Sequence, residues 1–164
     1  MKQPGAGFTL VETLVVMVII AVLAGAVAFN FVGADRERNL RTEVERLGAL
    51  IELARVQSLQ RNEEWGVTLS PDGYAFKVYE AENAAWKAVD DRPFQSRTLD
   101  TATLTVKVES FELPESARKE VPAIVVLSSG ELTPFEIQIT PKWQSPPWIL
   151  ASDGLSRTEA RRGT

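Results

Sequence analysis

The sequence predicts an α+β protein in which one long N-terminal helix packs on a C-terminal domain of antiparallel β-strands. Three features of the 164 residues support this prediction: an apolar run over 8–33, apolar residues at helical spacing up to residue 58, and an alternating pattern after residue 62. We therefore divide the chain into segments 1–7, 8–33, 34–62 and 63–164. The part that follows the apolar run, about 130 residues, suffices for one small domain with a core but not for two.

The apolar run has the length of a membrane-spanning helix. Residues 8–32 are apolar apart from Thr9, Thr13, Asn30 and one charged residue, Glu12. A helix of this length measures roughly 37 Å, and the hydrocarbon core of a bilayer is about 30 Å thick. The run is too long for a secretory signal peptide, and only Lys2 supplies positive charge before it. We therefore predict that the first half of the helix is transmembrane.

Glu12 is the unusual residue of this run. A carboxylate inside a spanning helix is unfavourable by about 2.5 to 3.5 kcal/mol on insertion scales, so it predicts a functional role and a cationic partner. If the chain were cut between Gly7 and Phe8, the new α-amino group of Phe8 would lie one helical turn from Glu12 on the same face. In an assembly of such helices, the carboxylate could instead pair with the amine of a neighbouring subunit.

The helix is expected to continue without a break over 34–62. No proline occurs between Pro4 and Pro71, and apolar or small residues recur at Leu40, Val44, Leu47, Ile51, Ala54 and Ser58. We interpret the later half of this stripe as packing on the chain's own β domain rather than on another subunit. Charges spaced by three or four residues predict surface ion pairs, which are Glu37–Arg41, Arg41–Glu45, Glu43–Arg46 and Glu52–Arg55.

Alternating residues and turn signals predict the strands of 63–164. Strands over 65–69 and 74–79 are expected to form a hairpin around the turn at 70–73, which contains Pro71-Asp72-Gly73. A strand is expected over 102–108, and a second hairpin is expected to pair 123–127 with 135–139. A short last strand covers 148–151. Residues 80–95 are expected to form a loop, 111–122 a connection, and the polar end 157–164 to fray.

The composition restricts the chemistry of the chain. There is no histidine and no cysteine, which excludes imidazole catalysis, thiolate nucleophiles, disulfides and zinc sites built on these ligands. We predict no catalytic residue, no metal and no cofactor. The acidic loop 80–91 has oxygen ligands suited to Ca²⁺, but a solvated loop is the favoured interpretation. Each of Trp86, Trp143 and Trp148 is a candidate partner anchor, although packing against the core is favoured.

The charge of the β domain argues against a nucleic-acid partner. Segment 63–164 carries eleven Lys and Arg against sixteen Asp and Glu. The C-terminal residues Arg157, Arg161 and Arg162 are the candidates for contact with phosphate, but a solvated terminus is the favoured interpretation.

The N-terminal residues resemble a known processing signal. The series Gly7-Phe8-Thr9-Leu10-Val11-Glu12, followed by an unbroken apolar stretch, is similar to the prepilin signature of type IV pilins and type II secretion pseudopilins. This resemblance implies cleavage after Gly7 by a prepilin peptidase and N-methylation of Phe8. It also implies that Glu12 pairs with the amino terminus of a neighbouring subunit during assembly.

A second resemblance lies near the C-terminus. The series Ser129-Gly130-Glu131-Leu132-Thr133-Pro134-Phe135 and the later Ser152-Asp153-Gly154-Leu155 resemble the pseudopilin H group of type II secretion, which shares a family with FimT-type pilins. The resemblance implies a pilin-like fold with a β-sandwich of two antiparallel sheets on the second half of the helix.

These resemblances imply a structural function rather than an enzymatic one. The expected protein is a minor pseudopilin that copolymerises through residues 8–33 with other pseudopilins. Its other partners would be the peptidase and, before assembly, inner-membrane lipid. The alternative is a FimT-type or competence-type minor pilin of type IV pilus assembly or DNA uptake. Positive charges after the span would keep the large domain in the cytoplasm, but the prepilin resemblance implies the periplasm, which we adopt.

Overall fold

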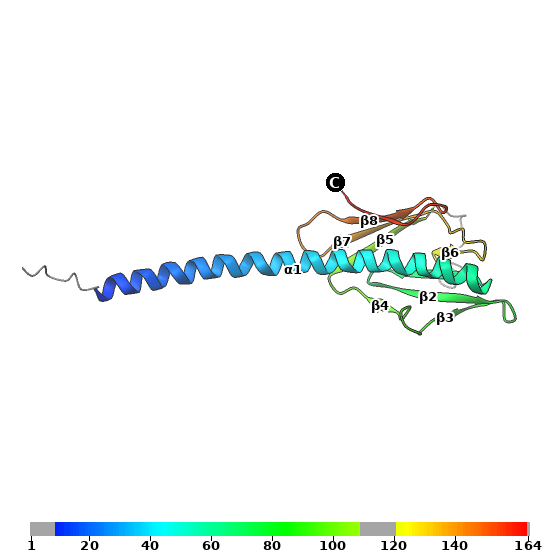
Figure 1. The fold of residues 1–164 in the computed structure, drawn as a ribbon, viewed down its shortest axis with the longest axis horizontal. Coiled ribbons are helices and arrows are strands. Elements are labelled where there is room, and N and C mark those ends of the chain that lie inside the picture. Colours follow the sequence, from blue (N-terminus) through cyan, green and yellow to red (C-terminus); the bar gives the residue numbers. More distant parts are fainter. Residues whose placement is uncertain (1–8, 109–120, 164) are drawn as a thin grey trace, which may run out of the picture. The chain divides into compact units, whose positions relative to one another are not determined.

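One helix and nine strands make up the fold in the computed structural model, which describes residues 9–108 and 121–163 (Figure 1). Their bounds are α1 Leu10–Arg61, β1 Trp65–Ser70, β2 Gly73–Glu80, β3 Ala85–Ala88, β4 Arg97–Thr98, β5 Ala102–Val108, β6 Ile124–Val126, β7 Phe135–Pro141, β8 Trp148–Ser152 and β9 Glu159–Arg162. The chain divides into two compact units, one up to Asn39 and one from Leu40 onward, which we call the head.

Helix α1 is one uninterrupted element of 52 residues, as the absence of proline predicts. It begins after Thr9, whose carbonyl oxygen accepts hydrogen bonds from the N–H groups of Glu12 and Thr13 at 3.0 and 3.2 Å. It ends at Arg61 because Asn62 adopts a left-handed conformation with φ of 53°, and the Glu63 N–H then donates to the Ser58 carbonyl at 3.2 Å.

None of the helices formed by the described residues has both the length and the apolar character needed to cross a membrane. The span predicted over 8–33 therefore stays a prediction. Phe8 and the side chains of residues 26–34 lie outside what the structure describes.

The apolar stripe of the head's helical segment is buried, which confirms its predicted role in packing on the chain's own domain. Each member is at most 1% exposed: Leu40, Val44, Leu47, Ile51, Ala54 and Ser58. The hydroxyl of Ser58 is satisfied within the helix, because it donates to the Arg55 carbonyl at 2.8 Å.

Two antiparallel sheets form the rest of the head, as expected. In the first, the strands lie in the order β3-β2-β1-β6, and β4 also pairs with β2; in the second, the order is β5-β7-β8-β9. The hairpin of β1 and β2 has the predicted turn, with Ser70 opposite Gly73. Strands β5 and β7 pair over their full length, from Ala102 opposite Pro141 to Val108 opposite Phe135.

Three sequence-based predictions about the strands are wrong. The segments 123–127 and 135–139 do not form a hairpin, because β6 pairs with β1 whereas β7 pairs with β5 and β8. The loop predicted over 80–95 contains β3, which pairs with β2. The end predicted to fray contains β9, which pairs with β8. Most of the connection predicted over 111–122 lies outside the described residues.

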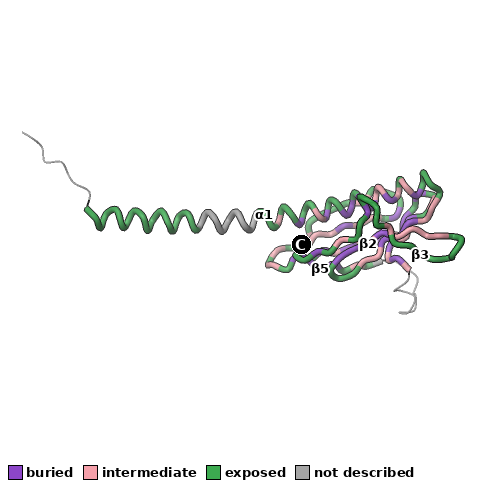
Figure 2. Tube along the Cα trace, turned by 90° about the horizontal axis from the view of Figure 1, so that it is seen from below, coloured by how far each residue is buried: buried purple, intermediate pink, exposed green. Residues whose placement is uncertain are grey.

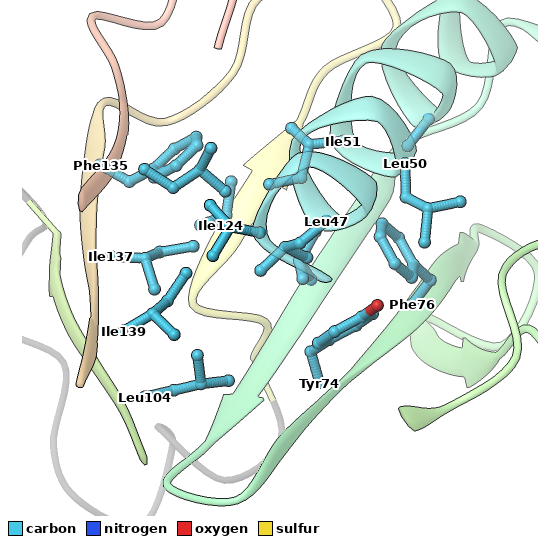
Figure 3. Close-up of a cluster of buried hydrophobic side chains, with 14 of the residues drawn as sticks. Leu47, Leu50, Ile51, Tyr74, Phe76, Leu104, Ile124, Phe135, Ile137 and Ile139 are labelled. Atoms are coloured by element: carbon cyan, nitrogen blue, oxygen red, sulfur yellow. The ribbon is translucent and has the colours of Figure 1, made fainter. Parts of the chain in front are cut away.

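The core lies where the two sheets meet the head's helical segment. Figure 3 shows Leu47 and Ile51 of α1 with Tyr74 and Phe76 of β2 on one side and Ile137 and Ile139 of β7 on the other. Figure 2 shows the buried residues gathered inside the head, whereas the first turns of α1 are exposed. Burial of this stripe by both sheets fixes the helix in the head.

Candidate assembly site

The N-terminal segment of α1 presents an apolar surface to its surroundings. Eleven large apolar side chains between Leu10 and Leu23 are exposed, from 44% for Val16 to 82% for Leu10. The exposed set consists of Leu10, Val11, Leu14, Val15, Val16, Met17, Val18, Ile19, Ile20, Val22 and Leu23. A contiguous apolar surface of this kind marks a site of contact with lipid or with other protein chains.

Glu12 supplies the carboxylate of this segment. It lies in the first turn of α1, where its N–H donates to the Thr9 Oγ1 at 3.3 Å. The hydroxyl of Thr13 donates to the Leu10 carbonyl at 2.8 Å, so that hydroxyl is satisfied within the helix. Among the residues that the structure describes, no cation forms an ion pair with the Glu12 side chain.

A second function of Glu12 follows from its position in the helix. Thr9 and Glu12 occupy the two key positions of a capping box, in which an N-cap threonine and a glutamate three residues later stabilise the start of a helix. A negative charge in the first turn also interacts favourably with the helix dipole. Any test of Glu12 in assembly must separate pairing from this local stabilisation. The predicted cleavage and methylation residues, Gly7 and Phe8, lie outside the described residues.

The head holds its helical segment through polar contacts that sequence spacing did not reveal. Of the predicted surface pairs, Arg41–Glu45 is present, with Nε 2.7 Å from Oε1. Glu43 instead binds Arg97 of β4, and the Arg97 Nε lies 2.7 Å from the Glu43 Oε2. This hydrogen-bonded pair raises the pKa of Arg97 above its ordinary value. Glu52 accepts hydrogen bonds from the N–H and the hydroxyl of Thr158, at 2.7 and 2.8 Å.

Arg55 forms the most hydrogen bonds of these residues. Its Nε donates to the Gly130 carbonyl, its Nη1 to the Ser156 carbonyl at 3.1 Å and its Nη2 to the Leu155 carbonyl at 2.6 Å. One guanidinium thus joins α1 to two turns. These turns contain the Ser-Gly and Ser-Asp-Gly-Leu series, so the motifs were visible in the sequence but their shared partner on the helix was not.

The first carboxylate of the acidic loop 80–91, that of Glu80, forms hydrogen bonds within the fold. Glu80 lies 2.8 Å from the Lys87 Nζ and 3.0 Å from the Asn83 amide nitrogen, and these hydrogen bonds lower the pKa of Glu80. In the part of the chain that is described, the structure places no group of three or more Asp, Glu, His or Cys side chains where they could hold a metal ion.

The candidate tryptophans and arginines are distributed over the head. Trp86 is half-buried and packs on Tyr79, with ring centroids 5.4 Å apart, while Trp143 and Trp148 pack partly buried against the core. Arg162 lies over the ring of Trp148, 4.8 Å from its centroid, and Arg161 lies 3.3 Å from Glu136. The structure therefore places two of the three C-terminal arginines in contacts within the second sheet.

A long N-terminal helix with an exposed apolar start and a head of two antiparallel sheets defines the pilin-like class of proteins. Within this class, the model of the family "Type II transport protein GspH" matches residues 43–158, and the "Prokaryotic N-terminal methylation motif" matches residues 5–28. The chain belongs to the GspH family of type II transport proteins.

Relatives and solved structures agree with this assignment. Type II secretion system protein H of Pseudomonas aeruginosa is 33% identical over 95% of this chain and 96% of its own length, and the corresponding protein of Aeromonas hydrophila is 29% identical over 82% and 80%. The minor pseudopilin EpsH of Vibrio cholerae is similar in fold, with a TM-score of 0.60 and 20% identity over 74% of this chain and 95% of that one. The solution structure of Escherichia coli GspH has a TM-score of 0.57 and 20% identity, over 75% and 87%.

Proposed function

We propose that this chain is a minor pseudopilin of type II protein secretion. In this proposal, a prepilin peptidase cuts between Gly7 and Phe8, Phe8 is N-methylated, and the chain copolymerises with other pseudopilins through its N-terminal helix. The match of residues 5–28 to the methylation motif supports the processing step, and the match of residues 43–158 to the GspH family supports the secretion system.

The observation that carries this proposal is an available carboxylate in the first turn of an exposed apolar helix. Transfer of such a helix from lipid to a bundle of similar helices changes its hydrophobic free energy little, because both environments are apolar. A charge pair in a dry interface, in contrast, is satisfied only at one axial offset between neighbours. Glu12 would therefore set the register at which each subunit docks, by pairing with the amino group of a neighbouring Phe8.

The proposed location follows from the same steps. Before assembly, residues 8–33 lie in the inner membrane and the head lies in the periplasm. Assembly moves the helix into the core of the pseudopilus, while the head stays outside that core. The function is structural rather than enzymatic, and the relatives named as type II secretion proteins support this assignment.

DNA uptake, the other function that the sequence leaves open, has less support. It would rely on the C-terminal arginines, but Arg161 and Arg162 contact Glu136 and Trp148 within the head. Both the family model and the curated relatives refer to type II transport. We therefore retain secretion as the proposed function.

Substitution of Glu12 tests the proposal. We expect that Glu12→Ala and Glu12→Gln are both cleaved and inserted in the membrane, but that incorporation into pseudopili falls by about tenfold or more because the charge pair is lost. Glutamine is also suited to the capping-box position, so Glu12→Gln separates the charge from helix capping. Incorporation is measured by the amount of the chain in sheared pseudopili. Normal incorporation of Glu12→Gln with a defect only in Glu12→Ala would show that Glu12 acts as a cap, and would contradict the proposal.

A further inference from the structure

The exposed apolar side chains of the head gather at one place. From Leu40 onward, the large apolar residues that are exposed in the described structure are Val56, Leu59, Leu127 and Leu155. They come from the last turns of α1, the segment after β6 and the turn between β8 and β9. Helix α1 ends beside the segment that follows β6 (Figure 1). We call these four residues the end surface.

Contacts at Gly130 and Arg55 join the three segments that carry the end surface. A Cβ atom at Gly130 would lie 3.0 Å from the Leu59 Cδ1, so the Leu59 side chain lies directly on this turn. The Gly130 N–H donates to the Leu127 carbonyl at 2.8 Å, and Arg55 binds the carbonyls of both Gly130 and Leu155. The segments that carry these three leucines therefore meet at one guanidinium and one glycine.

The backbone holds the two exposed loop leucines in place. The Leu127 N–H donates to the Glu131 carbonyl at 2.7 Å, and the Leu155 N–H donates to the Asp153 Oδ1 at 3.0 Å. Their carbonyls accept from Gly130 and Arg55. Leu155 is 69% exposed although both its backbone polar groups are bonded. A preorganised apolar group loses little conformational entropy on binding, which favours its use as a contact residue.

An acidic hollow adjoins the end surface. It has a volume of about 580 Å³ and is lined by residues at the end of α1, along β2 and at Ser128, which follows Leu127. Val78, Tyr79 and Ala81 contribute apolar surface, and the carboxylates in its lining are Glu63, Glu64, Glu80 and Glu82. Lys87 neutralises Glu80 only.

These carboxylates do not serve the stability of the helix. Glu63 and Glu64 directly follow the C-terminus of α1, where the helix dipole is negative and favours cations. Within the described residues, neither side chain has an ion-pair partner, and Glu82 has none either. The cation nearest to Glu63 and Glu64 along the chain is Arg61, which is exposed. The hollow thus combines the negative end of a helix with several carboxylates that have no ion-pair partner in the part of the chain that the structure describes.

We propose that the end surface and the acidic hollow together dock a protein partner that presents a lysine or arginine beside an aliphatic side chain. The aliphatic group would contact Leu59, Leu127 and Leu155, and the cation would enter the hollow along Val78 and Tyr79. The negative charge of the hollow argues against other binding partners. A second copy meeting the same surface would oppose two acidic hollows, and nucleic acid or an anionic lipid surface would be repelled.

The test uses the full chain in detergent and, as probes, the other pseudopilins of the same secretion system, each as a full chain. This choice of probes rests on the proposed function. We expect one probe to bind, with an affinity that Leu155→Ser and Glu63→Lys/Glu64→Lys each lower by about tenfold or more. The binding should also weaken as salt is raised.

Matched controls keep the result specific. Leu155→Met retains apolar area at the same position, and Asp90→Lys/Asp91→Lys makes the same change of charge at an exposed acidic pair outside the hollow. Both control variants should bind the probe with an affinity within about twofold of that of the original chain. Unchanged melting temperatures would show that the substitutions at these exposed positions leave the fold intact.

Three results would overturn the proposal: no probe binds, the bound probe is unaffected by both test variants, or the same variants abolish only self-association. The Glu12 variants, measured in parallel for incorporation into pseudopili, keep the two claims apart. If incorporation depends on the Glu12 charge but the end surface is inert, the docking surface is wrong and the proposed function stands. If incorporation is independent of the Glu12 charge, that result contradicts the proposed function, whatever the end surface binds.

Discussion

At the scale of single residues, the charged side chains of this protein divide between the fold and its surfaces. Glu52, Arg55 and Arg97 are bonded to other parts of the head, whereas Glu12, Glu63 and Glu64 have no ion-pair partner among the described residues. Residues of the first group stabilise the head. Residues of the second group form no ion pair within the described part of the fold. We therefore assign to them contacts with other molecules.

Asp153 belongs to the first group and gives the head a specific response to acid. Its carboxylate accepts hydrogen bonds from the N–H groups of Ser156 and Leu155, at 2.6 and 3.0 Å, and from the Ser156 hydroxyl at 2.9 Å. These bonds, with that from the Ser156 N–H first, hold the pKa of Asp153 below its ordinary value. A carboxyl group whose pKa is lower in the folded state stabilises that state above its unfolded pKa, and the stabilisation is lost as pH falls through the folded pKa.

The predicted consequence is a difference between the wild type and Asp153→Asn that depends on pH. The free energy of unfolding of the variant should be lower at neutral pH, and the gap should narrow as the pH falls below about 4, where Asp153 takes up a proton. Chemical unfolding at a series of pH values measures this gap. A gap of constant size across the acid range would contradict the assignment.

At the scale of elements, Arg55 connects α1 to the turns that follow β6 and β8. Because these turns carry Leu127 and Leu155 of the end surface, the same guanidinium stabilises the head and fixes that part of the surface. Gly154 contributes to the second turn, where φ is +90° and a Cβ atom would lie 2.4 Å from the Leu132 carbonyl oxygen. Only glycine fits this position without strain.

Removal of the Arg55 guanidinium should therefore destabilise the head. We expect Arg55→Met to lower the free energy of unfolding by about 2 to 3 kcal/mol, since three carbonyls lose a charged donor although water can replace part of it. Arg55→Lys should recover little, because an ammonium group cannot reproduce the three directed contacts. Arg61→Met, at an exposed position near the end of the same helix, serves as the control and should stay within about 0.5 kcal/mol. Equal effects at the two positions would argue against the connecting function of Arg55.

The elements also show which features a sequence reveals. The helix and the first hairpin were predictable because their signals are local: an apolar stripe without proline, and a Pro-Asp-Gly turn between alternating strands. The second hairpin was not, because the partner of β6 is the distant β1. Strand β9 escaped prediction since it is a charged, exposed edge without apolar alternation. Glu43, Glu52 and Arg55 were assigned neighbours along the helix, but burial of the helix gave them partners on other elements.

At the scale of the whole molecule, two surfaces have different chemistry and different assignments. The exposed N-terminal part of α1 is apolar with one carboxylate, and to it we assign polymerisation. The end surface of the head is a small apolar group beside carboxylates without an ion-pair partner among the described residues, and to it we assign recognition of a basic partner. The predicted site of polymerisation came from the sequence alone, whereas the end surface required the folded chain.

Processing at the N-terminus is the central claim, since assembly through Glu12 requires the free amino group of Phe8 on a neighbouring subunit. Mass spectrometry of the native protein, extracted from membranes of cells that contain the peptidase, tests this claim most directly. We expect a chain that begins with N-methylated Phe8. A native chain that still carries Met1 or Lys2 would contradict the account.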